Sequence, residues 1–212
     1  MSDIKHHISD SLMAAYVSGH LPHPYAIVVA SHISMCDECR SNHDSHLAAG
    51  GSILTSLSAA TVSDNLKNRV FDLLDEAPPA EPKPQKRQGV YPAPVMEALK
   101  GKQPKWRSLG MGVKQSILWD NTEGSVRLLY IPGGKAVPEH GHNGLEMTLV
   151  LQGAFADDDG RYGVGDVEIT DEDVDHTPIA EPGPACICLA ATDSPLRFKS
   201  VVPKLLQPIF RI

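Results

Sequence analysis

The sequence predicts a two-domain α plus all-β protein, in which a small helical bundle is followed by an antiparallel β-barrel. Three observations support this fold class. Apolar side chains recur at helical spacing before residue 77, a proline-rich stretch follows, and the remainder consists of short apolar runs separated by Gly, Pro and Asp. A chain of 212 residues is long enough to form two small domains with real cores.

About four helices are expected within residues 1–77, because apolar side chains recur there every three to four residues. In the first helix, Ser9 can cap the start and Gly19 ends the pattern. Four short helices in a segment of this length make only a marginal core. The expected ranges are roughly 8–18, 25–39, 43–57 and 63–74, the last with an apolar stripe of Leu66, Val70, Leu73 and Leu74.

A basic, proline-rich linker is predicted over residues 78–105. Residues 78–94 hold six of the 17 prolines, and proline is tolerated neither inside a helix nor in a central strand. The β domain is expected over residues 106–195, and residues 196–212 are expected to form a tail that packs on it. The expected strands lie at residues 113–119, 126–131, 146–151, 165–169 and 185–191.

The charge is unevenly distributed along the chain. The net charge is -7, yet residues 1–77 carry 4 basic and 9 acidic side chains, residues 78–107 carry 7 and 2, and the rest carry 8 and 15. Two acidic blocks without clustered Lys and Arg argue against nucleic-acid binding and favour a partner with a basic surface. No stretch is long and apolar enough to span a membrane or to form a signal peptide, so a cytoplasmic protein is expected.

A pattern of soft metal ligands, His32-x3-Cys36-x2-Cys39, lies in the helical region. On one continuous helix these side chains share a face within about 10 Å of axial rise, and imidazole with thiolate is typical of structural zinc. His43 follows on the same face but lies too far away to bind the same ion. A redox C-x-x-C pair or simple core thiols are the alternative, disfavoured because no βαβ unit surrounds them. The fourth ligand is expected from another segment, with His6, His7, His20 and His23 as candidates.

A second metal pattern lies in the β domain, where glycines frame His140-x-His142-x3-Glu146. Alternation along a strand places the two histidines on one face, and a bend at Asn143-Gly144 can return Glu146 to the same point. The full motif is Gly134-x5-His140-x-His142-x3-Glu146-x6-Gly153. His176, further along the chain, is the candidate for the last ligand.

Three imidazoles and one carboxylate suit Zn, Fe, Mn or Ni. A barrel without metal is disfavoured, because four unpaired ionisable groups would be costly to bury. Cys186 and Cys188 lie two residues apart on an expected strand, so they face the same way. We interpret them first as core thiols and only second as sensors.

The chain resembles the ChrR-type anti-sigma factors, which join a zinc-binding anti-sigma domain to a cupin domain, a jelly-roll β-barrel. The resemblance rests on His6-His7-Ile8-Ser9-Asp10, the segment from His32 to Cys39, the glycine-framed motif and residues 203–212. It implies that His7 completes a His2Cys2 zinc site. It also implies a second zinc site in the cupin domain, although another divalent ion is compatible with these ligands. The implied ligand sets are His7, His32, Cys36 and Cys39, and His140, His142, Glu146 and His176.

The resemblance further implies a function without catalysis. The N-terminal helices would bind a group IV (ECF-type) sigma factor and block its access to RNA polymerase and promoter DNA. The cupin would respond to a stress signal, usually oxidative, carried by an oxidant or a small molecule. Oxidation of a zinc-bound thiolate is a plausible release switch. The alternatives are a metal-dependent cupin enzyme of the dioxygenase or isomerase type with a zinc-stapled accessory domain and, last, a zinc-finger DNA binder, which the acidic charge disfavours.

Overall fold

The computed structural model describes residues 4–74, 84–141, 143–172, 175–195 and 197–198. One predicted ligand, His142, therefore lies outside the described residues. Of the predicted C-terminal tail, only the short strand β12 (Arg197–Phe198) is described, and it pairs with β4 (His140–Gly141).

Residues with known helix-capping or helix-starting preferences lie at the ends of the N-terminal helices. α1 (Asp10–Val17) is capped by Ser9, whose hydroxyl accepts the N–H of Leu12 at 3.4 Å, and it is followed by Gly19 with φ +73°. α2 (His23–Ile33) has Pro24 in its first turn, a position where the missing N–H costs nothing. α3 (Asp37–Ser56) follows after a short break.

That break corrects the prediction of one helix over residues 25–39. Cys36 has an extended backbone and is the N-cap of α3, where its sulfur accepts the N–H of Cys39 at 3.5 Å. Asp37 and Glu38 occupy the first turn of α3, where acidic side chains favour a new helix start. The two cysteines therefore belong to the beginning of α3, and His32 belongs to the last turn of α2.

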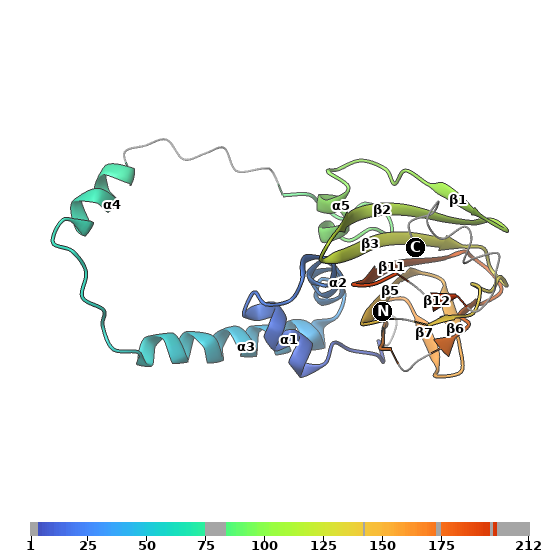
Figure 1. The fold of residues 1–212 in the computed structure, drawn as a ribbon, viewed down its shortest axis with the longest axis horizontal. Coiled ribbons are helices and arrows are strands. Elements are labelled where there is room, and N and C mark those ends of the chain that lie inside the picture. Colours follow the sequence, from blue (N-terminus) through green and yellow to red (C-terminus); the bar gives the residue numbers. More distant parts are fainter. Residues whose placement is uncertain (1–3, 75–83, 142, 173–174, 196, 199–212) are drawn as a thin grey trace.

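The fourth predicted helix forms but does not join the bundle. α4 (Leu66–Leu74) has no buried residue, and the second half of α3 is equally exposed. In Figure 1, α3 projects away from the β-sheets, and α4 lies far from the rest of the fold. The apolar stripe of α4 is thus left without a partner inside the described chain. No described helix is both long and apolar enough to cross a membrane.

The β region contains one large antiparallel sheet and two small ones. The large sheet has the strand order β1-β2-β3-β11-β5-β8, and the small sheets have the orders β10-β6-β7 and β12-β4-β9. All described pairings are antiparallel. The remaining bounds are β1 (Arg107–Gly110), β2 (Val113–Asn121), β3 (Gly124–Ile131), β5 (Glu146–Gln152), β6 (Ala154–Ala156), β7 (Arg161–Gly163), β8 (Val167–Thr170), β9 (Asp175–His176), β10 (Ile179–Ala180) and β11 (Cys186–Thr192).

The helices and the large sheet share one hydrophobic core. α2 contacts β3, β5 and β11, so it covers one face of the sheet (Figure 1). Within the predicted linker, α5 (Ala93–Ala98) adds the fully buried Val95 and Met96 and packs against α2. Prolines flank the start of α5, where they are tolerated. Members of this core include Met13, Val28, Val29 and Val95 from the helices and Val126, Leu128, Met147, Leu149 and Leu189 from the strands.

Two candidate metal centres

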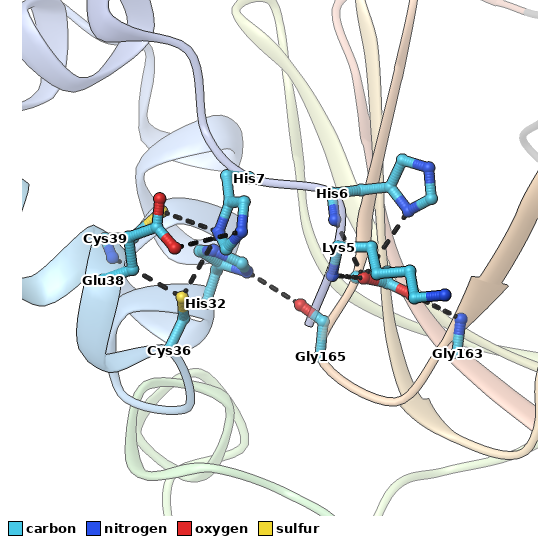
Figure 2. A network of polar contacts seen from close by, with 10 residues as sticks. Lys5, His6, His7, His32, Cys36, Glu38, Cys39, Gly163 and Gly165 are labelled. Atoms are coloured by element: carbon cyan, nitrogen blue, oxygen red, sulfur yellow. Dashed lines mark hydrogen bonds and ion pairs between the residues drawn. The ribbon is translucent and has the colours of Figure 1, made fainter. Parts of the chain in front are cut away.

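The structure brings His7, His32, Cys36 and Cys39 together, and we call this cluster the N-terminal centre. One ligand atom from each residue lies within 4.8 Å of the other three. Nδ1 of His7 lies 3.4 Å from Cys36 Sγ and 3.6 Å from Cys39 Sγ. Figure 2 shows His7 entering from the extended N-terminal segment, while the other three come from α2, the break and α3. Two imidazoles and two thiols arranged this way suit a tetrahedral soft cation.

His7 is the member that joins these three residues, whereas the other candidates for the fourth ligand lie elsewhere. His6 faces Asp166 and Tyr162, with Nδ1 3.5 Å from the Asp166 carboxylate. His20 is exposed, and His23 packs edge-on against Trp119 at a ring distance of 4.6 Å. The ligands converge because α2 ends at Ile33 and the chain turns, rather than because they share a helix face.

The His32 ring is held so that one nitrogen faces the cluster. Its Nδ1 lies 2.8 Å from the carbonyl oxygen of Gly165, at the turn before β8, and this contact makes Nδ1 the donor. Its Nε2 is fully buried and has no hydrogen-bond partner among the described residues. A buried nitrogen acceptor without a partner is costly, and a bound cation would satisfy it.

Burial also sets the protonation states in this centre. Desolvation lowers the pKa of His32 to about 4, so the ring is neutral at pH 7, as a metal ligand must be. Desolvation raises the pKa of Cys39 to about 11, with the neighbouring Cys36 also raising it. Without metal the Cys39 thiol is therefore protonated, and metal binding must release its proton.

We expect the metal-free protein to lose stability as the pH falls from about 6.5 towards 4. The pKa of His32 is depressed in the folded chain, so the unfolded chain takes up a proton first. The contribution that neutral His32 makes to the free energy of unfolding above pH 6.5 would be lost between pH 6.5 and pH 4. The loss is at most about 3 kcal/mol, since one pKa unit corresponds to about 1.4 kcal/mol. Urea unfolding at several pH values measures this loss. His32→Gln should flatten the dependence, whereas the exposed-site variant His20→Gln should retain it; equal slopes would contradict the assignment.

The extended segment that carries His7 is fixed to the β region through Asp166. Oδ1 of Asp166 accepts the backbone N–H groups of Lys5 (2.6 Å) and His6 (3.0 Å), and Oδ2 accepts that of Gly163 (2.8 Å). The N–H of Val167 in turn donates to the carbonyl of His6 at 3.2 Å. Burial would raise the pKa of Asp166, but these three N–H donors hold it below its usual value. The carboxylate is thus the charged anchor of the N-terminal segment.

Gly165 lies at a position where only glycine fits. Its φ is +95°, and a Cβ there would lie 2.6 Å from the Ile4 side chain. At this turn the Gly165 carbonyl also lies within hydrogen-bonding distance of His32 on α2. Figure 2 shows this contact between the two halves of the molecule.

A second cluster, the C-terminal centre, contains His140, Glu146 and His176. Their ligand atoms lie within 4.8 Å of one another, and all three residues are buried. His140 and His176 are register partners in β4 and β9, with ring centroids 4.7 Å apart. His140 Nδ1 contacts the carbonyl of Pro138 at 2.8 Å, and Thr148 donates to Glu146 at 3.0 Å. These contacts orient two ligands of an N,O site, which suits several divalent ions.

Two buried carboxyl groups hold the far side of the His176 ring. Nδ1 of His176 lies 2.9 Å from Asp157 Oδ2 and 3.4 Å from Glu168 Oε1, and none of the three side chains is more than 2% exposed. Burial by itself would lower the pKa of His176, but Glu168 and Asp157 raise it to about 9. Burial raises the pKa of Glu168 to about 8. Without a metal the His176 ring is therefore protonated at pH 7, and because Asp157 and Glu168 hold Nδ1, Nε2 is the nitrogen that would release its proton to bind a cation.

Sequence reasoning missed Asp157. The run Asp157-Asp158-Asp159 has the composition of a solvated turn, and the latter two residues are exposed. Asp157 instead turns inward, with Oδ1 accepting the N–H groups of Asp159 and Gly160 at 3.1 Å each. The signal available in the sequence was the Asp-x2-Gly spacing typical of such a turn, but nothing local indicates which carboxylate faces inward.

Asp157→Asn should lower the affinity of the C-terminal centre for a divalent cation by about 10- to 100-fold. The amide loses the charge that fixes the His176 ring, whereas the ligand atoms themselves are unchanged. Competition with a chromophoric chelator measures the affinity. Asp158→Asn makes the same change at the exposed neighbour and serves as the control. If the two variants bind the cation equally well, Asp157 has no part in the centre.

Cys186 and Cys188 lie in a second core, on the opposite side of β11 from the core that the helices share. Both are buried, with their sulfurs 3.4 Å apart. The hydrogen bond between the two thiols and burial raise the pKa of Cys188 well above its usual value. A protonated, buried thiol is a poor nucleophile, which favours a packing role.

Comparisons with known proteins agree with this architecture. A family model described as the ChrR cupin-like domain matches residues 96–194. The chain is 49% identical over 212 residues to the anti-sigma-E factor ChrR of Cereibacter sphaeroides, with 99% of each chain covered. It is also similar to the crystal structure of Rhodobacter sphaeroides SigE in complex with the anti-sigma ChrR. That similarity has a TM-score of 0.79 at 46% identity, and it covers 90% of this chain and 100% of the other.

Proposed function

Because the chain belongs to the ChrR family of anti-sigma factors, we propose that it binds an ECF-type sigma factor and blocks access of that factor to RNA polymerase. It is a regulatory protein and not an enzyme. The proposed sigma-binding part comprises residues 1–77. Residues 78–105 connect it to the cupin domain, residues 106–195, and residues 196–212 form the tail.

The observation that carries this proposal is an exposed apolar surface, which we call the apolar arm. Its side chains are between 36% and 71% exposed, and they lie on the second half of α3, the following loop and α4. Large apolar side chains gathered in one exposed segment mark a protein–protein interaction site. The arm consists of Ile53, Leu54, Leu57, Val62, Leu66, Val70, Phe71, Leu73 and Leu74.

The charge of the N-terminal block fits the same partner. Residues 1–77 carry 4 basic and 9 acidic side chains, and a sigma factor presents basic surfaces for DNA. Opposite charges accelerate docking and orient it, while the apolar arm supplies buried area. An acidic surface equally disfavours direct DNA binding by this chain.

We propose zinc for the N-terminal centre, because two thiolates and two imidazoles are the ligands that structural zinc prefers. The ion would tie the N-terminal segment to α2 and α3. For the C-terminal centre we propose zinc or another divalent ion, held by His140, Glu146 and His176 with His142. The cupin part would receive a cytoplasmic stress signal, of the oxidative kind, and end the inhibition.

The proposal is tested with the full-length chain. A fragment ending near residue 85 would lack the large sheet, and α2 shares one hydrophobic core with that sheet. The buried side chains of α2 would be exposed in such a fragment. Purified protein should form a stable complex with a purified ECF-type sigma factor on size exclusion, and it should inhibit transcription by the sigma–core polymerase holoenzyme in proportion to its concentration. A protein with zinc bound at the N-terminal centre that neither forms the complex nor inhibits transcription would refute the proposal.

A further inference from the structure

A short segment of the β region, residues 163–168, contacts both metal centres. It comprises the end of β7, the turn that contains Gly165 and Asp166, and the start of β8. Four of the contacts that fix the positions of His7, His32 and His176 come from this segment. The two centres themselves come from different halves of the sequence.

On the N-terminal side, the segment holds two ligands in different ways. The Gly165 carbonyl accepts from His32 Nδ1 at 2.8 Å and thereby aims Nε2 at the cluster. The Asp166 carboxylate accepts the N–H groups of Lys5 and His6, so it fixes the residues that immediately precede His7. Loss of either contact would leave the ligand identities unchanged but would misplace their atoms.

On the C-terminal side, Glu168 reaches the other centre. Its carboxylate lies 3.4 Å from His176 Nδ1, beside Asp157. Only Val167 separates Glu168 from Asp166. Val167 is itself fixed, because its N–H donates to the His6 carbonyl and its side chain is buried in the shared core. Since an extended strand rises about 3.3 Å per residue, the two contacts lie within about 7 Å along a rigid element.

We propose that residues 163–168 couple the two centres, so that metal occupancy of the C-terminal centre changes the metal affinity of the N-terminal centre. With the C-terminal centre occupied, the His176 ring would be held against Glu168, and β8 would keep Gly165 and Asp166 where they support His32 and His7. An emptied or altered C-terminal centre relaxes these contacts. The coupling deepens the proposed function and rests on it, because it gives the cupin a physical route to the zinc that organises the sigma-binding helices.

The test measures the N-terminal centre while the other centre is changed. Co²⁺ serves as the probe, because thiolate-to-cobalt charge-transfer absorption reports only the cysteine-containing site. His140→Ala weakens the C-terminal centre and should lower the Co²⁺ affinity of the N-terminal centre by about 5- to 150-fold. In an Asp166→Asn background the same His140→Ala change should have less than about a twofold effect. Asp158→Asn, an exposed carboxyl change, should leave the coupling intact.

Coupling between binding equilibria is reciprocal, which gives an independent check. Cys39→Ser, which damages the N-terminal centre, should in turn lower the Co²⁺ affinity of the C-terminal centre, measured by competition with a chromophoric chelator. If Asp166→Asn does not fold, Glu168→Gln interrupts the same route at its other end. An N-terminal affinity that is unchanged by His140→Ala in a folded protein would overturn the proposal. No sigma factor is present in these titrations, so a failure here is distinct from a failure to bind sigma.

Discussion

Cys39→Ser should abolish capture of the sigma factor, with at least a 100-fold loss of affinity. The Cys39 side chain is buried in the N-terminal centre, and its sulfur faces His7. A structural zinc site contributes on the order of 10 to 16 kcal/mol, which is comparable with the whole stability of a small domain. Without the ion, His7 would no longer be tied to His32, Cys36 and Cys39 through a common cation, and the helices that hold the apolar arm would lose their orientation.

The measurement combines zinc content with binding to immobilised sigma factor. Cys186→Ser is the matched control, since it makes the same change at a buried cysteine in the second core, outside the N-terminal centre. It should retain the zinc of the N-terminal centre and sigma binding. Chelation of zinc from the parent protein should reproduce the Cys39→Ser result. Undiminished sigma binding by Cys39→Ser, or by the chelated protein, would show that the ion does not organise the binding surface.

Val70→Asp should weaken sigma binding by about 30- to 700-fold while leaving the fold intact. Val70 lies at the centre of the α4 stripe and is 48% exposed, so the free protein loses little by the change. In the complex, a carboxylate at a buried apolar position would be desolvated without a partner. Truncating a central interface anchor typically costs roughly 2–4 kcal/mol, which corresponds to this range of Kd.

Asn68→Asp is the matched control for this prediction. Asn68 lies two residues away on the opposite side of α4, so the variant adds the same charge outside the stripe. Calorimetric titration with the sigma factor gives the two affinities, and urea unfolding of the free proteins gives their stabilities. Equal loss of affinity in both variants would indicate a general charge effect, and no loss in either would remove α4 from the interface.

Most of the candidate metal ligands were predictable from the sequence because their patterns are local. Cys36 and Cys39 are three residues apart, and His140 and Glu146 lie within one framed motif, so residue type and spacing suffice to propose them. His7 came from the family resemblance alone, since spacing left four histidines open. The helix prediction over residues 25–39 was wrong because Cys36 and the acids after it start a new helix. Periodicity does not detect that kind of break within an apolar pattern.

Helix α4 and the apolar stripe it carries were also predictable, but the separation of α4 from the other helices was not. An apolar stripe predicts burial against something, and the sequence does not say whether that partner is the chain itself. Conversely, α5 was hidden by prolines that predict a linker, although they occupy the one part of a helix that accepts them. For α5 the deciding interaction is its packing on α2, which is distant in the sequence.

The sequence by itself specified two sets of candidate metal ligands, an acidic helical segment and an antiparallel β region. Only the tertiary structure decided how they are connected. His32 meets Gly165 across 133 residues, and His6 meets Asp166 across 160. Asp157 turns inward to His176, and α2 lies on the sheet as part of one core. Such contacts depend on how the packed elements approach one another. The spacing of residues along the chain does not determine the distance in space between residues that are far apart in the sequence.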